Sequence, residues 1–73
     1  MLTFDEKKVL LNKYMKTGLT FEEAQKRVNE FNYYLREIHF KNREVLSEKD
    51  INKIFKDEFE RMCQKLESET TKK

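Results

Sequence analysis

The fold class of this chain is decided by residues 20–41, TFEEAQKRVNEFNYYLREIHFK. Apolar residues recur in this segment at alternating steps of three and four positions. That spacing places them on one side of an α-helix, whereas a β-strand would require an alternation of two. The apolar stripe consists of Phe21, Ala24, Val28, Phe31, Leu35 and Ile38. We expect this helix to be the central element of the fold, with its stripe buried in the core or in a dimer interface.

The composition favours helices along the whole chain. Its 73 residues include no proline and one glycine, while Glu, Lys and Leu, which are good helix formers, are plentiful. A domain of this length buries only about 60% of its unfolded surface, so its stability must come from well-formed helices, a filled core or a partner chain. We predict an all-α fold, either a small three-helix bundle or an open three-helix array with a long central helix.

Three helix starts carry the same signal, a hydroxyl residue followed three positions later by an acid. In such a capping box the hydroxyl accepts a hydrogen bond from a free backbone N–H, and the acid reaches back to the N–H of the cap residue. The side chain of Asp is shorter than that of Glu, so a box that ends in Asp should be incomplete. The pairs are Thr3 and Glu6, Thr20 and Glu23, and Ser47 and Asp50.

These starts predict helices over residues 4–16, 21–41 and 48–66, in a single domain of residues 1–67 followed by a frayed polar tail at 68–73. Gly18 should end the first helix in a left-handed conformation, with Leu19 folding back on the last turn. Asn42 is the only stop residue for the second helix. The predicted apolar face of the first helix is Phe4, Leu10, Leu11, Tyr14 and Met15, and that of the third is Ile51, Ile54, Phe55, Phe59, Met62 and Leu66, with Cys63 at its margin.

Charge and cysteine content exclude several classes of protein. Charged residues make up 41% of the chain, but the net charge is only +2 and both signs are spread along it. A typical nucleic-acid-binding domain carries a one-sided basic surface instead. A single cysteine rules out an internal disulfide framework, and no apolar run approaches the length of a signal peptide or a membrane span. We expect a cytoplasmic protein with no membrane partner.

Few residues could carry catalysis or bind a metal. His39 and Cys63 are the only histidine and cysteine, and no third group is evident that would orient them as a catalytic pair. One His and one Cys cannot supply a zinc site, and the acids at 57, 58 and 60 are typical of a solvated helix face. We therefore expect no enzymatic activity, no cofactor, no metal and no small-molecule substrate.

The far side of the central helix offers the main candidate for function. Tyr33 and Phe40, seven residues apart, fall opposite the apolar stripe, and Tyr34 lies at its edge. In one interpretation the other two helices, together with the turn between the second and third helices, cover these aromatic residues. In the other they form an aromatic anchor for a protein partner, because interface cores are enriched in such residues. The predicted partner-binding residues are Tyr33, Tyr34, Arg36, Glu37 and Phe40, with a homodimer as a further possibility.

A nucleic-acid-binding regulator is the alternative function. The first two helices and their glycine turn have the outline of a helix-turn-helix motif. However, Tyr14 is bulky for the helix crossing, and Glu22 and Glu23 would repel phosphates at the start of the recognition helix. The candidate nucleic-acid-binding residues are Lys7, Lys8, Lys13, Lys16, Lys26 and Arg27.

The Lys, Glu, Asn and Phe content is similar to that of small regulatory proteins of AT-rich bacteria, their plasmids and their phages. That similarity lies in composition and rests on no motif. The sequence therefore predicts a small non-enzymatic regulatory or inhibitory protein that binds a protein partner through a helix face.

Overall fold

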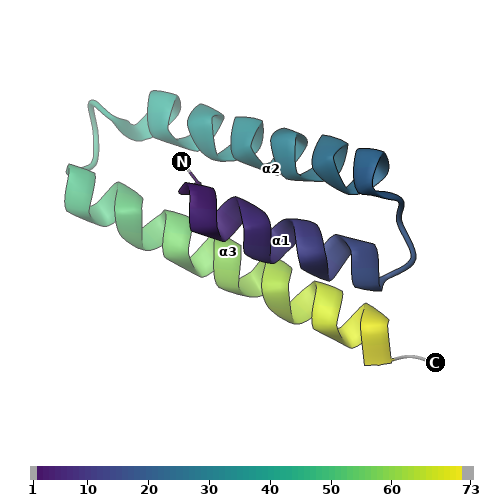
Figure 1. The fold of residues 1–73 in the computed structure, drawn as a ribbon. Coiled ribbons are helices and arrows are strands. Elements are labelled where there is room, and N and C mark those ends of the chain that lie inside the picture. Colours follow the sequence, from purple (N-terminus) through teal and green to yellow (C-terminus); the bar gives the residue numbers. More distant parts are fainter. Residues whose placement is uncertain (1, 72–73) are drawn as a thin grey trace.

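The structure is a computed structural model that describes residues 2–71, and these form three helices. Helix α1 spans Phe4–Lys16, α2 spans Phe21–Asn42 and α3 spans Glu48–Thr71. α1 and α3 run in the same direction, and α2 runs opposite to both (Figure 1). The described residues contain no strand, so the prediction of a small all-α fold of three helices is confirmed.

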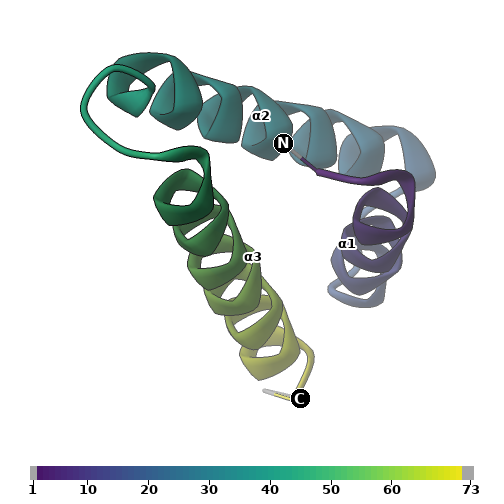
Figure 2. The same cartoon turned by 90° about the vertical axis from the view of Figure 1, so that its left-hand side faces the viewer.

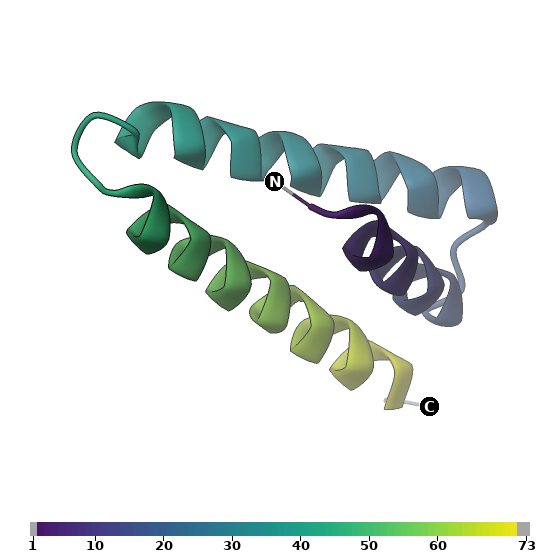
Figure 3. The ribbon, with the colours of Figure 1, turned by 60° about the vertical axis from the view of Figure 1, so that its left-hand side comes forward.

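One side of α2 carries both of the other helices. Figures 1, 2 and 3 are turned about the same vertical axis, and each shows α1 and α3 below α2 with no helix above it. The backbone N–H of Leu2 donates to the side-chain oxygen of Asn32 at 3.0 Å, so the chain enters α1 beside the middle of α2. α1 then runs along the N-terminal half of α2 towards the turn that joins them (Figure 3). The C-terminal half of α2 therefore extends beyond the reach of α1.

The core is built on the apolar stripe of α2. Four of the six predicted stripe residues are buried, and Ile38 is half-buried and packed against the same cluster. The hydroxyl of Tyr14 lies 3.4 Å from the sulfur of Met62, and this partly buried contact joins α1 to α3 at the edge of the core. The buried residues are Leu2, Leu10, Tyr14, Ala24, Val28, Phe31, Leu35, Ile51 and Leu66.

Three residues predicted to lie in the core are largely exposed. Phe4 is 67% exposed, Met15 40% and Phe21 53%, so none of them belongs to the core of this chain. The prediction was wrong for Phe4 and Met15, and for Phe21 it was wrong as to the core, while the alternative of a dimer interface stays a prediction. Phe4 and Phe21 are the first residues of their helices, and Met15 lies in the last turn of α1. The periodic pattern continues to the ends of each helix, but the packing between helices does not reach that far. On α3, only Ile51 and Leu66 are fully buried, and the other predicted core positions are half-buried.

The helix starts follow the predicted capping boxes. The hydroxyl of Thr3 accepts from the N–H of Glu6 at 3.1 Å, and the Glu6 carboxylate accepts from the N–H of Thr3 at 2.9 Å. Thr20 and Glu23 form the same reciprocal pair. At the third start the N–H of Asp50 donates to the hydroxyl of Ser47 at 3.3 Å, and this is the only one of the two bonds that forms between these residues.

The helix ends differ in how well they were predicted. Gly18 has a φ of 109° and donates its N–H to the carbonyl of Met15, as expected for a glycine that ends a helix. α2 ends one residue later than predicted, at Asn42, whose side-chain amide donates to the carbonyl of Ile38 at 2.8 Å.

The predicted end of α3 at Leu66 was wrong, because this helix continues to Thr71. Residues 68–71 are therefore helical and not a frayed tail, and the rest of that predicted tail, residues 72–73, lies outside the described residues. The segment contains no glycine or proline to stop the helix. In addition, the hydroxyl of Thr70 donates to the carbonyl of Leu66 at 2.9 Å.

Candidate protein-binding surface

The side of α2 that α1 and α3 leave uncovered carries two aromatic side chains. Tyr33 is 63% exposed and Phe40 is 66% exposed. Arg36 and Glu37 lie between them along the helix and are also exposed. We call these four residues the outer face of α2. The structure thus agrees with the interpretation in which the other helices do not cover Tyr33 and Phe40.

Tyr34, the fifth predicted partner-binding residue, lies on a different flank of α2. Its ring centroid is 6.3 Å from that of Phe31, which is a core residue. Tyr34 also lines a shallow groove together with Tyr14 of α1 and Met62 of α3. It therefore faces the neighbouring helices and is separate from the outer face.

A hollow adjoins the outer face where the end of α2 meets the start of α3. Its volume is about 410 Å³. The ring of Phe40 forms part of its wall, and the guanidinium carbon of Arg43 lies 4.6 Å from the centre of that ring. Arg43 is not among the predicted partner-binding residues, although its position three residues after Phe40 matches the spacing of neighbours on a helix. The hollow is lined by Arg36, His39, Phe40, Glu48, Asn52 and Phe55.

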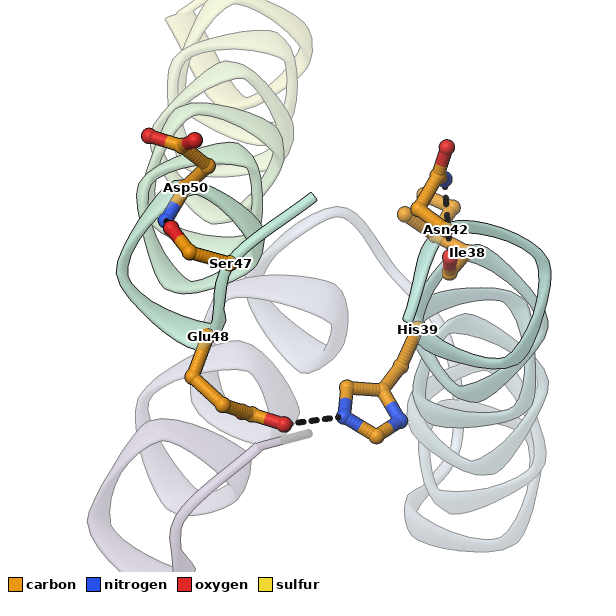
Figure 4. A network of polar contacts seen from close by, with 6 residues as sticks. All are labelled: Ile38, His39, Asn42, Ser47, Glu48 and Asp50. Atoms are coloured by element: carbon orange, nitrogen blue, oxygen red, sulfur yellow. Dashed lines mark hydrogen bonds and ion pairs between the residues drawn. The ribbon is translucent and has the colours of Figure 1, made fainter. Parts of the chain in front are cut away.

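Polar contacts hold the two helices together at this corner. Figure 4 shows the imidazole of His39 on α2 pointing towards the carboxylate of Glu48 on α3, with 3.1 Å between the Nε2 and Oε1 atoms. The ring of His39 also lies 6.3 Å from the ring of Phe55. On either side of this pair, the Asn42 and Ser47 side chains complete the end of α2 and the start of α3 (Figure 4). The walls of the hollow are thus fixed by contacts from both helices.

Two arginines lie beside Phe40 at the rim of the hollow. Among the described residues, neither Arg36 nor Arg43 forms an ion pair. Glu48, the acid that lines the hollow, is paired with His39. A guanidinium presents several N–H donors in a planar fork that matches a carboxylate. Two such groups therefore flank an exposed aromatic ring and are available to a ligand.

The candidate nucleic-acid-binding residues are dispersed. Lys13 is paired with Glu67 of α3 at 2.6 Å, and this hydrogen bond raises the pKa of Lys13 and lowers that of Glu67. The ammonium of Lys8 lies over the ring of Phe4, 5.5 Å from its centre. Lys26 lies on the uncovered side of α2 beside two acids, and Arg27 lines the grooves next to Tyr14. Lys7 and Lys16 are exposed on α1. These six residues are distributed over two helices and more than one side of the molecule.

Cys63 and His39, the two residues considered as a catalytic pair, have different neighbours in the structure. Cys63 is half-buried against the core, and this burial raises the pKa of its thiol. His39 contacts Glu48 and Phe55 and not the thiol. Within residues 2–71, no three His, Cys, Asp or Glu side chains are grouped so that they could hold a metal ion. No helix in the same range combines the length and apolar content that crossing a bilayer requires.

Comparison with known proteins gives no relative: no protein-family model, curated protein or solved structure matches this chain.

Proposed function

We propose that this chain is a small non-enzymatic regulatory or inhibitory protein that binds a protein partner on the outer face of α2. The observation that carries the proposal is the exposure of Tyr33 and Phe40 on the side of α2 that neither α1 nor α3 covers. Aromatic residues and arginine are enriched in interface cores and among the residues that dominate binding energy. The outer face and its rim contain two aromatic side chains and two arginines.

The two rings supply enough apolar surface to anchor a partner. An aromatic side chain buries about 150–250 Å² when it is fully covered. At the exposures given above, covering both rings would remove about 200–300 Å² from water, a gain of about 5–8 kcal/mol before the cost of association is subtracted. The cost of association is of similar size, so burial of the two rings contributes to binding but does not by itself set an affinity.

The chemistry of the partner follows from the surroundings of Phe40. The hollow offers the rings of Phe40 and Phe55 to an apolar side chain, while Arg36 and Arg43 offer charged N–H donors at its rim. A partner that fits both features presents an apolar side chain next to a carboxylate. Such a pair of side chains would bury the Phe40 ring and give the two arginines acidic partners, which they lack among residues 2–71.

The test is affinity capture from a lysate of the source organism, followed by mass spectrometry. The Tyr33→Ala, Phe40→Ala double variant should lose the captured protein, and Val45→Ala should retain it. Val45 is the matched control because it is 80% exposed but lies in the connection between α2 and α3. Circular dichroism should show unchanged helix content in all three proteins. Equal capture by the wild type and the double variant would contradict the proposal.

The same experiment separates protein binding from nucleic-acid binding. Nuclease treatment of the lysate should leave the captured protein unchanged. Binding through Lys and Arg contacts to phosphates would instead be abolished by nuclease and would weaken steeply with salt, because bound counterions are released. The structure gives no specific support to that alternative, since its six candidate residues are dispersed.

A further inference from the structure

Three lysines on α3 adjoin the hollow that Phe40 lines. Lys49, Lys53 and Lys56 recur at steps of four and three, which places them on one side of the helix. All three are exposed, and they line a second, shallow hollow of about 420 Å³. Asn52 lines both hollows, so the two adjoin each other. We call the three residues the lysine row of α3.

The lysine row lies on the side of α3 that α1 contacts farther along the helix. At 100° per residue, the row and Glu67 fall within about 60° of one another around the helix axis, and Glu67 is bound to Lys13 of α1. On α2, Arg36 follows Asn32 by one turn, and Asn32 accepts from the backbone of Leu2 just before α1. Figures 1 and 3 show that α1 does not reach the corner at which α2 joins α3. The two hollows therefore lie beyond the start of α1, on the sides of α2 and α3 that face it.

Unpaired cations predominate on this surface. Arg36 and Arg43 lie on the α2 side and the lysine row on the α3 side, and within residues 2–71 none of these groups forms an ion pair. Two acids lie among them, Glu48, which contacts α2, and Asp50, which lines the second hollow. Glu37 follows Arg36 in the sequence but is rotated from it by about 100° around α2. Since the net charge of the whole chain is only +2, this corner carries a local excess of positive charge.

We propose that an acidic segment of the protein partner binds across both hollows, with an apolar side chain against Phe40 and carboxylates along the lysine row. This inference rests on the proposed function and adds α3 to its surface. The positive charge of the corner favours an acidic occupant, because the potentials of two binding surfaces are complementary. The row extends about 10 Å along α3, so a partner helix with acids at the same steps of four and three would match it.

The two acids of the corner favour a peptide over a nucleic-acid strand as the occupant. A peptide can place an uncharged apolar side chain beside Glu48 and its carboxylates beside the lysines. A nucleic-acid strand carries a phosphate at every nucleotide, so it cannot avoid Glu48 and Asp50 in the same way.

Fluorescence anisotropy with labelled synthetic peptides tests the inference. Each probe is an acetylated, amidated, alanine-rich peptide with one phenylalanine and three glutamates at steps of four and three, and two probes carry the phenylalanine before or after the glutamates. At least one should bind the wild type, and its affinity should fall as salt is added, because exposed charges are screened. Lys49→Glu, Lys53→Glu and Lys56→Glu together should weaken binding by at least about tenfold, since each exposed ion pair contributes a factor of about 1.4–5 and its reversal adds repulsion.

Two controls separate the loss of positive charge from a loss of fold. A probe with lysines in place of its glutamates should bind the triple glutamate variant more tightly than it binds the wild type. The same change to glutamate at three other exposed lysines should leave the affinity of the acidic probe unchanged. These control positions lie on α1 and on the opposite side of α3, and they are Lys8, Lys16 and Lys65.

Three results would overturn the inference. They are no binding of either acidic probe up to about 1 mM, equal binding by the wild type and the triple glutamate variant, and tighter binding of a single-stranded DNA of matched length. Capture of the partner from lysate distinguishes this failure from that of the proposed function. A partner that is lost on Tyr33→Ala with Phe40→Ala but retained by the triple glutamate variant removes the inference alone, and one that both variants retain removes both proposals.

Discussion

Truncation of Leu35 should distinguish the two sides of α2 by their free energies of unfolding. Leu35 is completely buried, so Leu35→Ala removes three carbon groups from the core, worth about 2.4 kcal/mol of transfer free energy. The cavity that remains adds to this, and we expect a loss of about 3 kcal/mol. A 73-residue domain has a total stability of about 4–11 kcal/mol, so the loss is a large fraction of it. The melting temperature should fall by about 12–24 °C.

The matched change on the opposite side is Tyr33→Ala together with Phe40→Ala. These side chains are mostly exposed, and alanine is the better helix former by roughly 0.5 kcal/mol per residue. That gain offsets the loss of the Arg43 contact with Phe40, about 0.5–1 kcal/mol at an exposed site. The double variant should therefore unfold within about 1 kcal/mol of the wild type. Urea denaturation followed by circular dichroism measures both values, and similar losses for the two variants would refute the distinction between the sides.

Three further predictions concern the helix ends and the contact between α1 and α3. Gly18→Ala should cost about 1–2 kcal/mol in urea denaturation, because the φ of 109° is strained for a residue with a Cβ, although no atom lies within 4 Å of that carbon. Thr20→Ala should cost about 1 kcal/mol. Hydrogen bonds from Thr20 lower the pKa of Glu23. The cap should therefore stabilise the fold fully above the ordinary carboxyl pKa of about 4.3, and its stabilisation should be lost as the pH falls through the lowered pKa. Thermal melts across the acidic pH range measure this loss. The hydrogen bond with Glu67 raises the pKa of Lys13. The stabilisation of the fold by this pair should be complete below the ordinary lysine pKa of about 10.4 and be lost as the pH rises through the raised pKa. Glu67→Gln should remove this dependence of the melting temperature on alkaline pH.

Local signals made the helix starts predictable. A capping box involves residues three positions apart, and its two hydrogen bonds form within one turn. The boxes at Thr3 and Thr20 are therefore present in full, and the glycine that ends α1 has the expected backbone conformation. The end of α3 lies beyond the predicted end at Leu66 because a polar composition does not by itself end a helix. In the absence of glycine or proline, the helical hydrogen bonds continue through such a segment.

Contacts between helices could not be predicted in the same way. The periodic pattern indicated which side of each helix is apolar but not how far the neighbouring helices extend along it, so Phe4, Met15 and Phe21 were assigned to the core. The hydrogen bond from the backbone N–H of Leu2 to the side chain of Asn32 joins residues thirty positions apart, and no local pattern in the sequence predicts it. At the candidate site, the period of α2 placed Tyr33 and Phe40 opposite the apolar stripe but left open whether the other helices cover them, and their exposure is visible only in the structure. The hollow did not, because half of its wall comes from α3.

The unequal lengths of α1 and α2 explain where the uncovered surface lies. α1 has 13 residues and α2 has 22, so at 1.5 Å per residue they span about 20 Å and 33 Å. Because the chain enters α1 beside Asn32, α1 runs along the N-terminal half of α2, and the C-terminal end of α2 lies beside the beginning of α3. That end of α2 is joined to α3 by the contact of His39 with Glu48 and with the ring of Phe55, while the amide of Asn42 bonds within α2 to the carbonyl of Ile38. Because α2 extends beyond the end of α1, its C-terminal part exposes side chains on more than one side. The hollow beside Phe40 lies at this part of the helix.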